Sequence, residues 1–405
     1  MKVQEFIEEG EISLEADKER IEKVKREMEL EGFDALWCRL PENVLYLSGY
    51  WPVIGASAIL FPLDGDPVLI APVDEIDYTS RSWVKDIKTF KFLALEAVTD
   101  ANRDISKILK EVAWDKRLEK AVIGYEGSYE LIAANHVGGE ARYPGFPALN
   151  MLKETVSKAT FRDAKPSLTK LRVTKTQLEI EILRKTNEIA CFGFDAAREV
   201  LEPGIKESAV AAAVEGRIHA EGIGYNITER ARGFAFVMSG PSSANSWRPF
   251  CISTDRKIRK GDMVLVELDT YADGYWSDLT RTFVVGEPDK KEHEIWDIVL
   301  LAEQRAIEAI HGGVKAAEID AFARSTIEEK GYGKYFLHGL GHGVGLAFHE
   351  PPTLHPASKD ILLPGMTHAV EPSICIPEWG GMRVEDNVLV TEKKAIFLSD
   401  YDRGL

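Results

Sequence analysis

The segment MVLVELDTYADGYWSDLTRTFVV at 263–285 restricts the fold of this chain more than any other. Two runs rich in β-branched and aromatic residues flank Asp273-Gly274, a dipeptide that predicts a tight turn in a β-hairpin. Side chains two apart in a strand share a face, so Glu267 and Asp269 lie together on the first strand. A two-residue turn places Asp269 directly opposite Asp278, whereas a turn shifted by one residue places Glu267 there instead.

Two or three carboxylates therefore meet on one face of the hairpin, whichever register it takes. Like charges directly opposite each other destabilise a sheet unless a cation lies between them. A divalent metal is the most economical cation, because paired carboxylates suit Mn²⁺, Fe²⁺, Co²⁺ or Zn²⁺. The alternative is an exposed, solvated hairpin face with Arg281 nearby.

Four of the nine histidines fall within FLHGLGHGVGLAFHEPPTLH at 336–355. His338 and His342 have a helical spacing, but alternating glycines between 339 and 345 favour a strand or an extended loop. In a strand the two histidines share one face, and glycine forms the other, where another backbone or a substrate can approach closely. The alternative is that these are core or loop histidines bound to backbone carbonyls.

Two glutamates lie inside apolar, strand-like runs: Glu371 in HAVEPSICI and Glu385 in GMRVEDNVLV. A carboxylate in such a run needs a partner. Arg383 is one candidate partner for Glu385, and a metal ion is the other. The combined segments supply a set of oxygen and nitrogen ligands in which four carboxylates would balance two divalent cations. Its members are Glu267 or Asp269, Asp278, His342, Glu371 and Glu385.

Composition narrows the class of protein. The chain has 405 residues, enough for two or three domains, and its 45% hydrophobic and 29% charged residues exclude wholesale disorder. A net charge of −16 disfavours binding to nucleic acid or to anionic membranes. The sequence has no run of 18 apolar residues and no secretory signal pattern at its start, so we expect a cytoplasmic protein. Its four widely spaced cysteines are expected to be buried, reduced thiols.

A change of pattern near residue 165 predicts two domains. Residues 1–165 alternate a helix at 14–31 with short apolar runs, the rhythm of an α/β domain. Residues 166–405 open with a capping-box pattern, Thr174-Lys175-Thr176-Gln177, ahead of a helix. The order of helices and long antiparallel strands in this second part predicts an α+β fold. We expect helices over 175–201, 206–221, 289–311 and 316–330, and strands over 231–239, 263–269, 275–285, 368–376 and 386–390.

Together these motifs resemble those of the pita-bread metallopeptidases, the M24 or creatinase-type family, in the branch of aminopeptidase P and prolidase. The matching segments are GDMVLVELDTYADGYWSDLTRTF (261–283), HGLGHGVGLAFHEPP (338–352), VEP (370–372) and RVED (383–386). The segment LRVTKTQLEIEILRKTNEIA (171–190) is similar to the one that opens the catalytic domain in this branch. The resemblance implies a creatinase-type α/β N-terminal domain, a pita-bread catalytic domain and a homodimer.

The resemblance also implies a dinuclear metal site. Asp278 and Glu385 would bridge two divalent ions (Mn, Co, Zn or Fe), with His342 and Glu371 on one of them. The two metals would generate hydroxide at neutral pH and polarise the scissile carbonyl. Glu371 would also act as the general base.

Two further histidines have counterparts in the family. His349, in HEPP, resembles the histidine that stabilises the tetrahedral intermediate. His338 resembles a histidine on the substrate side of the metal ligands or directly behind them.

The chain departs from the family pattern in two places. The family usually has Asp where Glu267 stands and Gly where Asp269 stands, so which of the two completes the second metal site stays open. Family peptidases also carry a histidine in a stretch like SGPSSANSWRPF (239–250), where this chain has Trp247 and Arg248 instead. We hypothesise that Arg248 binds a substrate carboxylate, because guanidinium groups match carboxylates in geometry; a surface salt bridge is the alternative. Trp247, His349 and Arg383 are the other candidate substrate contacts.

The leading functional hypothesis is a metal-dependent hydrolase that cleaves short peptides before proline. One alternative keeps the fold and the metals but acts on a small non-peptide substrate, as dimethylsulfoniopropionate lyases do. Against it, Phe348 stands where those lyases resemble one another in having a catalytic Asp. Two further alternatives are a metal-free C–N hydrolase like creatinase or ectoine hydrolase, and a catalytically dead peptide-binding module. Such relatives usually lose metal ligands, which this chain retains.

Overall fold

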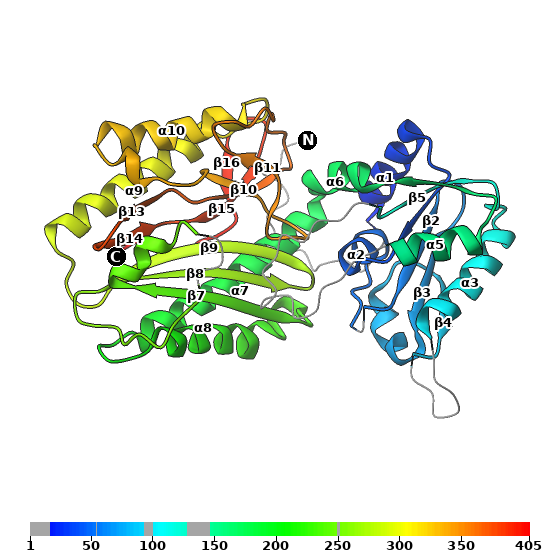
Figure 1. The fold of residues 1–405 in the computed structure, drawn as a ribbon, viewed down its shortest axis with the longest axis horizontal. Coiled ribbons are helices and arrows are strands. Elements are labelled where there is room, and N and C mark those ends of the chain that lie inside the picture. Colours follow the sequence, from blue (N-terminus) through cyan, green and yellow to red (C-terminus); the bar gives the residue numbers. More distant parts are fainter. Residues whose placement is uncertain (1–16, 54, 93–99, 128–145, 249–251) are drawn as a thin grey trace. The chain divides into compact units, whose positions relative to one another are not determined.

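The computed structural model describes residues 17–53, 55–92, 100–127, 146–248 and 252–405 (Figure 1). The chain divides into two compact units, Met1–Leu171 and Arg172–Leu405. The division falls within helix α6 (Lys165–Val173). We describe the N-terminal unit and the C-terminal unit separately.

The N-terminal unit is built on a mixed six-stranded sheet with the order β4-β3-β2-β1-β5-β6. Strands β1, β2 and β3 are buried at every position, so their apolar runs form the core of this unit. Helices α3 and α5 pack against one face of this sheet (Figure 1). The elements are α1 (Lys18–Glu31), β1 (Ala35–Cys38), α2 (Pro41–Ser48), β2 (Ala58–Pro62), β3 (Val68–Pro72), β4 (Asp86–Phe90), α3 (Ala101–Asp115), β5 (Val122–Tyr125), α5 (Phe146–Thr155) and β6 (Thr160–Asp163).

Glu126, directly after β5, caps the start of α2 from within the core. Its carboxylate accepts hydrogen bonds from the backbone N–H groups of Arg39 (2.8 Å) and Leu40 (3.1 Å) and from Nδ2 of Asn43 (2.7 Å). Burial outweighs these hydrogen bonds and raises the pKa of Glu126 to about 7.

The C-terminal unit contains two antiparallel sheets, ordered β7-β8-β9 and β11-β10-β12-β15-β16, and a separate hairpin, β13-β14. Helices α7 and α8 cover the first sheet, and α9 and α10 pack against the second (Figure 1). The helices are α7 (Gln177–Val200), α8 (Glu207–Gly222), α9 (Lys290–Ala309) and α10 (Ala316–Glu329). The strands are β7 (Ala231–Ser239), β8 (Met263–Ala272), β9 (Tyr275–Val284), β10 (Gly341–Gly343), β11 (Glu350–Leu354), β12 (Thr367–Val370), β13 (Ser373–Ile376), β14 (Gly380–Arg383), β15 (Asp386–Val390) and β16 (Ala395–Phe397).

The α+β prediction for this unit is confirmed, and its four helices lie within two residues of the predicted ranges. Two details differ. The capping box of α7 is formed by Thr176 and Glu179, two residues later than the predicted pattern. The strand predicted over 368–376 is two strands, β12 and β13, interrupted at Glu371-Pro372, because proline has no N–H for a ladder.

The glycine face predicted around β10 is filled by backbone. A Cβ on Gly341 would lie 2.0 Å from the carbonyl oxygen of Ala369, and one on Gly343 would lie 2.7 Å from that of Glu350. These contacts bring β12 and β11 close to β10, so the glycines serve close strand packing. The helical alternative for this histidine-rich segment is wrong, because 338–349 forms a short strand and loops.

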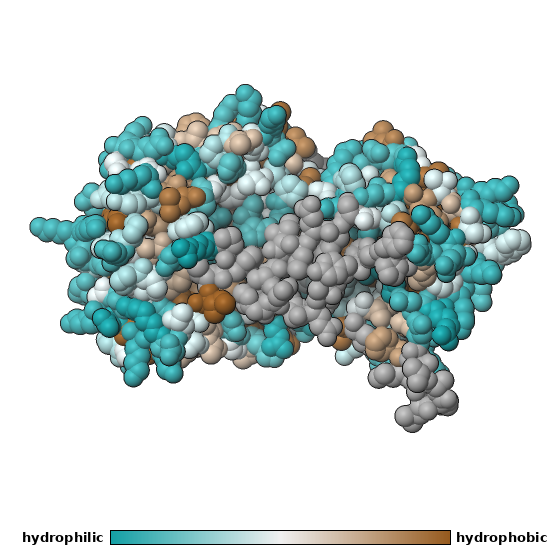
Figure 2. Space-filling model, viewed as in Figure 1, coloured by the Kyte–Doolittle hydropathy of each residue, from teal (hydrophilic) through white to brown (hydrophobic). Residues whose placement is uncertain are grey.

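Hydrophilic residues cover most of the face of each unit seen in Figure 2. Among the described residues, no helix combines the length and the apolar character that a membrane span requires. Cys38, Cys191 and Cys375 are free thiols, although Cys191 is only partly buried. Cys251 lies outside the described residues.

Candidate metal centre

The hairpin of β8 and β9 has the first of the two predicted registers. Asp273 and Gly274 both have positive φ angles, of 48° and 96°, as a two-residue turn of this kind requires. Asp269 lies directly opposite Asp278, and Glu267 lies opposite Thr280. The turn therefore places the three acidic side chains on one face of the hairpin.

This face of the hairpin is buried. Asp269 is 2% exposed and Asp278 is 4% exposed, so the alternative interpretation, a solvated hairpin face, is wrong. Arg281 does not balance these acids, because it points from the opposite face of β9 and pairs with Asp386 (2.7 Å).

His342, on β10, faces two acids. Its Nε2 atom lies 3.4 Å from Oδ2 of Asp278 and 3.7 Å from Oε1 of Glu371. Its Nδ1 atom lies 3.0 Å from the carbonyl oxygen of Gly343. A proton on Nδ1 would satisfy that carbonyl, and Nε2 could then either donate a second proton to the acids or offer its lone pair to a metal.

His338 and His349 flank the same cluster. Nδ1 of His338 lies 3.9 Å from Oε2 of Glu371, and its Nε2 lies 2.6 Å from the hydroxyl of Ser373. The ring of His349 lies 4.1 Å from that of His342, measured between centroids. The alternative of histidines bound to backbone carbonyls is correct for one nitrogen of His338 and of His342, and the second nitrogen of each faces a side chain.

Glu385 and Asp278 are tied together across two sheets. The hydroxyl of Thr280 donates to Oε2 of Glu385 (2.6 Å), and the backbone of Thr280 bridges to that of Glu385. Asn387 hydrogen-bonds both backbone groups of Asp278, at 3.1 Å and 2.8 Å. Asn387 was not predicted, because nothing in its local sequence pattern distinguishes it from an ordinary strand residue.

Arg383 is not the partner of Glu385 that the sequence suggested. Its Nη1 atom lies 3.2 Å from Oε2 of Glu267 and 3.3 Å from Oε2 of Glu371. Its Nη2 donates to the carbonyl oxygen of Ser246. Glu385 is turned instead toward Thr280 of β9, which explains why the prediction failed.

Trp247 and Arg248 follow Ser246 at the surface. Trp247 is 38% exposed, and the guanidinium carbon of Arg248 lies 5.2 Å from the centre of its ring. Within the described part of the chain, Arg248 makes no ion pair, so the alternative of a surface salt bridge finds no partner there. Residues 249–251 of the same stretch lie outside the described residues.

Burial raises the pKa of four carboxyl groups in the cluster: Glu267, Asp269, Glu371 and Glu385. For Glu267 the raised pKa is about 7, although the charge of Arg383 opposes the shift. Neighbouring carboxylates add to the effect at Asp269 and Glu385. The protein alone therefore does not stabilise all of these acids in their ionised form.

The pKa values of the three histidines shift in opposite directions: that of His342 is raised, and those of His338 and His349 are lowered. Burial alone would lower the pKa of His342, but its hydrogen bond to Asp278 and the charges of the acids raise it to about 9. The same contact lowers the pKa of Asp278 against the effect of burial. Burial lowers the pKa of His338 to about 3 and that of His349 to about 4, so both are neutral at pH 7.

Two observations fit this cluster to metal ions. Three carboxylate oxygens are buried and accept no hydrogen bond from any described residue: Oε2 of Glu267, Oδ1 of Asp278 and Oε1 of Glu385. Asp278, His342 and His349 can each offer a ligand atom such that all three lie within 4.8 Å of one another, and so can His342, Glu371 and Glu385. Carboxylate oxygen and imidazole nitrogen are ligands that divalent transition metals accept.

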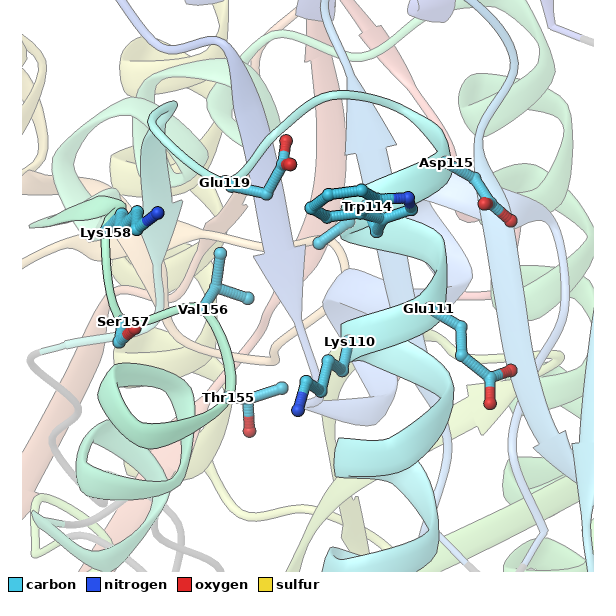
Figure 3. A pocket seen from close by; sticks show the side chains of 10 residues that line it. Lys110, Glu111, Trp114, Asp115, Glu119, Thr155, Val156, Ser157 and Lys158 are labelled. Atoms are coloured by element: carbon cyan, nitrogen blue, oxygen red, sulfur yellow. The ribbon is translucent and has the colours of Figure 1, made fainter.

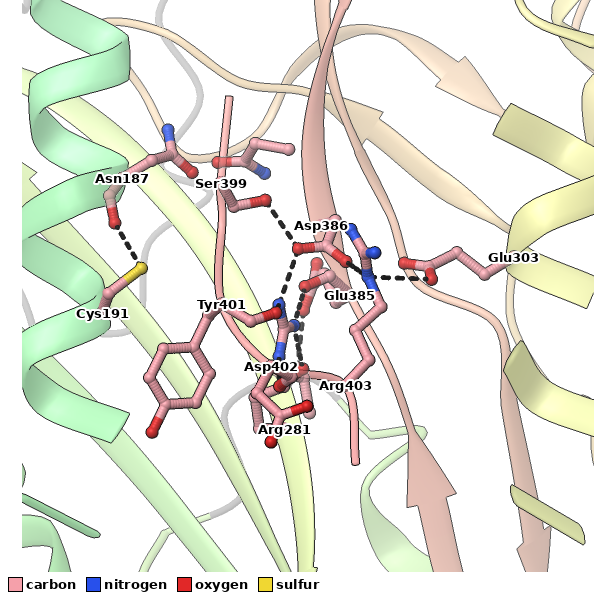
Figure 4. Close-up of polar contacts among 12 residues, drawn as sticks. Asn187, Cys191, Arg281, Glu303, Glu385, Asp386, Ser399, Tyr401, Asp402 and Arg403 are labelled. Atoms are coloured by element: carbon pink, nitrogen blue, oxygen red, sulfur yellow. Dashed lines mark hydrogen bonds and ion pairs between the residues drawn. The ribbon is translucent and has the colours of Figure 1, made fainter. Parts of the chain in front are cut away.

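A second network supports the strand that follows Glu385 (Figure 4). Arg281, 1% exposed, pairs with Asp386 and donates from Nη1 to the carbonyl oxygen of Glu385 (2.7 Å). Arg403 and the hydroxyl of Ser399 also bind Asp386. This network fixes the backbone on which Glu385 is carried.

The N-terminal unit has a hollow of its own, with a volume of about 700 Å³, between α3 and the turn after α5 (Figure 3). Trp114 on its rim is 71% exposed. None of the site residues predicted from the sequence lines it. Its other lining residues are Lys110, Glu111, Ala113, Asp115, Glu119, Thr155, Val156, Ser157 and Lys158.

The fold and the buried cluster of acids and histidines define a metallohydrolase. Two sequence profiles match the chain: metallopeptidase family M24 over residues 181–392, and the creatinase/prolidase N-terminal domain over residues 20–174. A Xaa-Pro dipeptidase of Pyrococcus furiosus is 35% identical over 388 residues, which cover 96% of this chain and 99% of that protein. The chain belongs to metallopeptidase family M24 and has the creatinase-type N-terminal domain of its prolidase branch.

Solved structures agree with this assignment. The prolidase from Pyrococcus furiosus superposes with a TM-score of 0.73 at 34% identity, covering 94% of this chain and 100% of that one. The prolidase from Pyrococcus horikoshii OT3 superposes with a TM-score of 0.76 at 32% identity, covering 96% and 100%. The predicted family, the predicted fold and the prediction that this protein is a metallopeptidase are confirmed.

Proposed function

We propose that this metallopeptidase uses two divalent metal ions to cleave short peptides before proline. The convergence of Asp278, His342, Glu371 and Glu385 in one buried cluster is the observation that carries the proposal. The names of the similar proteins, Xaa-Pro dipeptidase and prolidase, support the choice of substrate.

The ligands divide into shared and separate groups. Asp278 and Glu385 would contact both ions, as the family resemblance implies, and each has a buried oxygen that accepts no hydrogen bond in the described chain. His342 and Glu371 would hold one ion, and Glu267 or Asp269 would complete the site of the other. When bound, the two ions supply a polarised scissile carbonyl and an acidified water.

The surrounding side chains move protons and orient the peptide. Glu371 would take the proton of the attacking water and pass it to the leaving proline nitrogen. His349, neutral at pH 7, would donate a hydrogen bond to the carbonyl oxygen as negative charge develops on it. His338 would lie on the substrate side of Glu371 or directly behind it, since its Nδ1 atom is 3.9 Å from Oε2 of that residue.

Substrate contacts are proposed for Trp247 and Arg248, and an indirect effect on substrate is proposed for Arg383. Arg248 is exposed and stacked on Trp247, so its guanidinium group can reach a peptide carboxylate. Arg383 is buried between Glu267 and Glu371, so its influence on substrate would pass through these acids.

The lyase alternative finds no support at Phe348. That side chain is buried in an aromatic cluster, with its ring 5.0 Å from Trp276 and 4.8 Å from His349. A phenyl ring transfers no proton, so this position offers no group for eliminating a small substrate.

Metal content and hydrolysis measured together test the proposal. We expect two tightly held ions per chain by plasma mass spectrometry after loading with Mn²⁺, and hydrolysis of Ala-Pro but not of Pro-Ala. Asp278→Ala should lose both properties, whereas Asp297→Ala, which changes an exposed acid on α9, should keep them. No retained metal in the wild-type protein under any loading condition would exclude this function. Two ions without cleavage before proline would exclude the proposed substrate.

We also propose that the protein is a cytoplasmic homodimer, as the family resemblance implies. Light scattering coupled to size-exclusion chromatography tests the dimer: the molar mass measured for the eluting protein should be twice the 45.2 kDa of one chain.

A further inference from the structure

Positive charge is unevenly distributed around the five carboxylates of the cluster. The guanidinium group of Arg383 lies against Glu267 and Glu371, at 3.2 Å and 3.3 Å. His342 lies against Asp278 and again Glu371, at 3.4 Å and 3.7 Å. Both basic groups thus contact Glu371, and each also contacts one other acid: Glu267 for Arg383 and Asp278 for His342.

Asp269 and Glu385 receive no such support. Asp269 is 2% exposed and Glu385 is 1% exposed, and neither forms an ion pair with any basic side chain in the described part of the chain. Asp269 lies directly opposite Asp278, whose Oδ1 atom accepts no hydrogen bond there, and the same holds for Oε1 of Glu385. Oε2 of Glu267 accepts no hydrogen bond either, but it faces the positive charge of Arg383 at 3.2 Å. Asp278 shares the one positive charge beside it, that of His342, with Glu371. Buried negative charge that no positive charge balances is costly, so the missing positive charge belongs beside Asp269, Asp278 and Glu385.

Glu267 is placed differently. It lies opposite Thr280, one pair along the ladder from Asp269 and Asp278. Its longer side chain brings Oε2 to Arg383, an ion pair that lies largely within the protein. If Glu267 turned toward a metal ion, Arg383 would lose one of its two partners.

We propose that Asp269, together with Asp278 and Glu385, holds the second metal ion, and that Glu267 serves as the counter-ion of Arg383. This inference rests on the proposed dinuclear site and decides which of two acids completes it. The two ions would then differ in surroundings, because one has His342 and the other has only carboxylates. An all-carboxylate site favours a hard, oxygen-seeking ion such as Mn²⁺.

A matched pair of neutral isosteres tests the assignment. Asp269→Asn and Glu267→Gln each remove one negative charge from the same face of β8 with little change in size. Titration of the metal-free proteins with Mn²⁺ in a calorimeter should show two ions for the wild type, two for Glu267→Gln and one for Asp269→Asn. The electron paramagnetic resonance spectrum should show coupled Mn²⁺ ions in the first two and an isolated ion in the third.

Thermal stability supplies a second readout. Without metal, Asp269→Asn should melt at a higher temperature than the wild type, because Asn neither carries a charge beside Asp278 nor has to take up a proton when the chain folds. With saturating Mn²⁺, the order should reverse, since the variant gains stability from one ion fewer. If Asp269→Asn fails to fold, Asp269→Ser provides the same comparison.

Each other outcome overturns the assignment. Two ions in Asp269→Asn exclude Asp269 as a required ligand. One ion in Glu267→Gln places Glu267 in the coordination sphere, whether or not Asp269 is there too. If the wild type binds no metal, the proposed function fails as a whole, which separates that failure from an exchange of ligands.

Discussion

The Nζ atom of Lys175 lies 3.0 Å from Oε2 of Glu350 inside the C-terminal unit. Arg172 binds the other oxygen of Glu350 at 2.7 Å. A Cβ on Gly345 would lie 2.6 Å from Glu350 Oε2 and 2.9 Å from Lys175 Nζ, so a side chain at this position would displace the pair. Because Glu350 follows His349, the segment that opens the C-terminal unit is tied to the loop that carries this histidine.

Removing the Lys175 charge should destabilise the protein and disturb this loop. We expect Lys175→Met to lower the free energy of unfolding by about 3 kcal/mol, because it leaves Glu350 buried with only Arg172. Urea denaturation measures the loss, and kcat should fall with it as His349 loses its support. Lys315→Met, which removes the exposed Lys315–Glu318 pair, is the control and should cost less than about 1 kcal/mol. Equal losses of unfolding free energy in the two variants would show that the buried Lys175–Glu350 pair stabilises the protein no more than the exposed Lys315–Glu318 pair does.

The two neighbouring histidines should differ in what they contribute. His342→Ala should release metal, since its Nε2 faces Asp278 and Glu371. His349→Ala should keep both ions and lower kcat by about a hundredfold, the usual loss when a hydrogen-bond donor to a developing negative charge is removed. Metal content and steady-state kinetics on the same preparations check both. Loss of metal from His349→Ala would instead make His349 a ligand, as its proximity to Asp278 and His342 allows.

Arg248→Ala should weaken substrate binding without changing the chemical step. We expect KM for an Xaa-Pro dipeptide to rise about tenfold with kcat unchanged, since the guanidinium group would bind the substrate carboxylate alike in the ground and transition states. The matching dipeptide amide lacks this carboxylate, so the variant and the wild type should hydrolyse it equally. Arg259→Ala, another exposed arginine in the C-terminal unit, serves as the control. A parallel loss with acid and amide substrates would exclude the proposed contact.

Glu126 should make the stability of the N-terminal unit depend on pH. Its pKa in the folded chain is about 7 and its ordinary value is 4.5, so between these values the folded state holds a proton that the unfolded state has released. This contribution is complete below pH 4.5 and is lost as pH rises to about 7, by up to about 3 kcal/mol. In Glu126→Gln the side chain stays neutral, so urea denaturation at pH 5 and pH 8 should show a smaller fall than in the wild type. The same fall in both proteins would mean that Glu126 is ionised throughout this range.

Local pattern accounts for much of what could be predicted. Period-two alternation and Asp273-Gly274 were sufficient to predict the hairpin and, as one of two registers, the pairing of Asp269 with Asp278. Regular strand geometry propagates a turn over several residues, so this long-range detail follows from a short-range signal. The predicted clustering of Asp278 with His342 rested on shared chemistry and on family resemblance.

What failed depended on contacts that no local pattern encodes. The partner of Arg383 could not be predicted, because it is Glu267 of a strand distant in the sequence rather than Glu385, two residues away. Asn387 behind Asp278 and Arg403 behind Asp386 could not be predicted either. Asn387 approaches only when two sheets pack together, and Arg403 approaches only when the segment after the last strand folds back. Supporting residues of this kind become visible only in three dimensions.

The Asp273-Gly274 turn has a consequence for how this protein can change in evolution. Lys185 binds the Asp273 side chain at 2.9 Å, and the backbone N–H groups of Glu229 and Arg230 bind it as well. One inserted or deleted residue in the turn would shift β8 against β9 and separate Asp269 from Asp278. A substitution in the cluster exchanges one ligand, whereas a change of length would remove the pairing altogether. Single acidic residues of the cluster can therefore be substituted without loss of the hairpin register. An insertion or deletion in this turn cannot be made without that loss, because it changes which residues face each other.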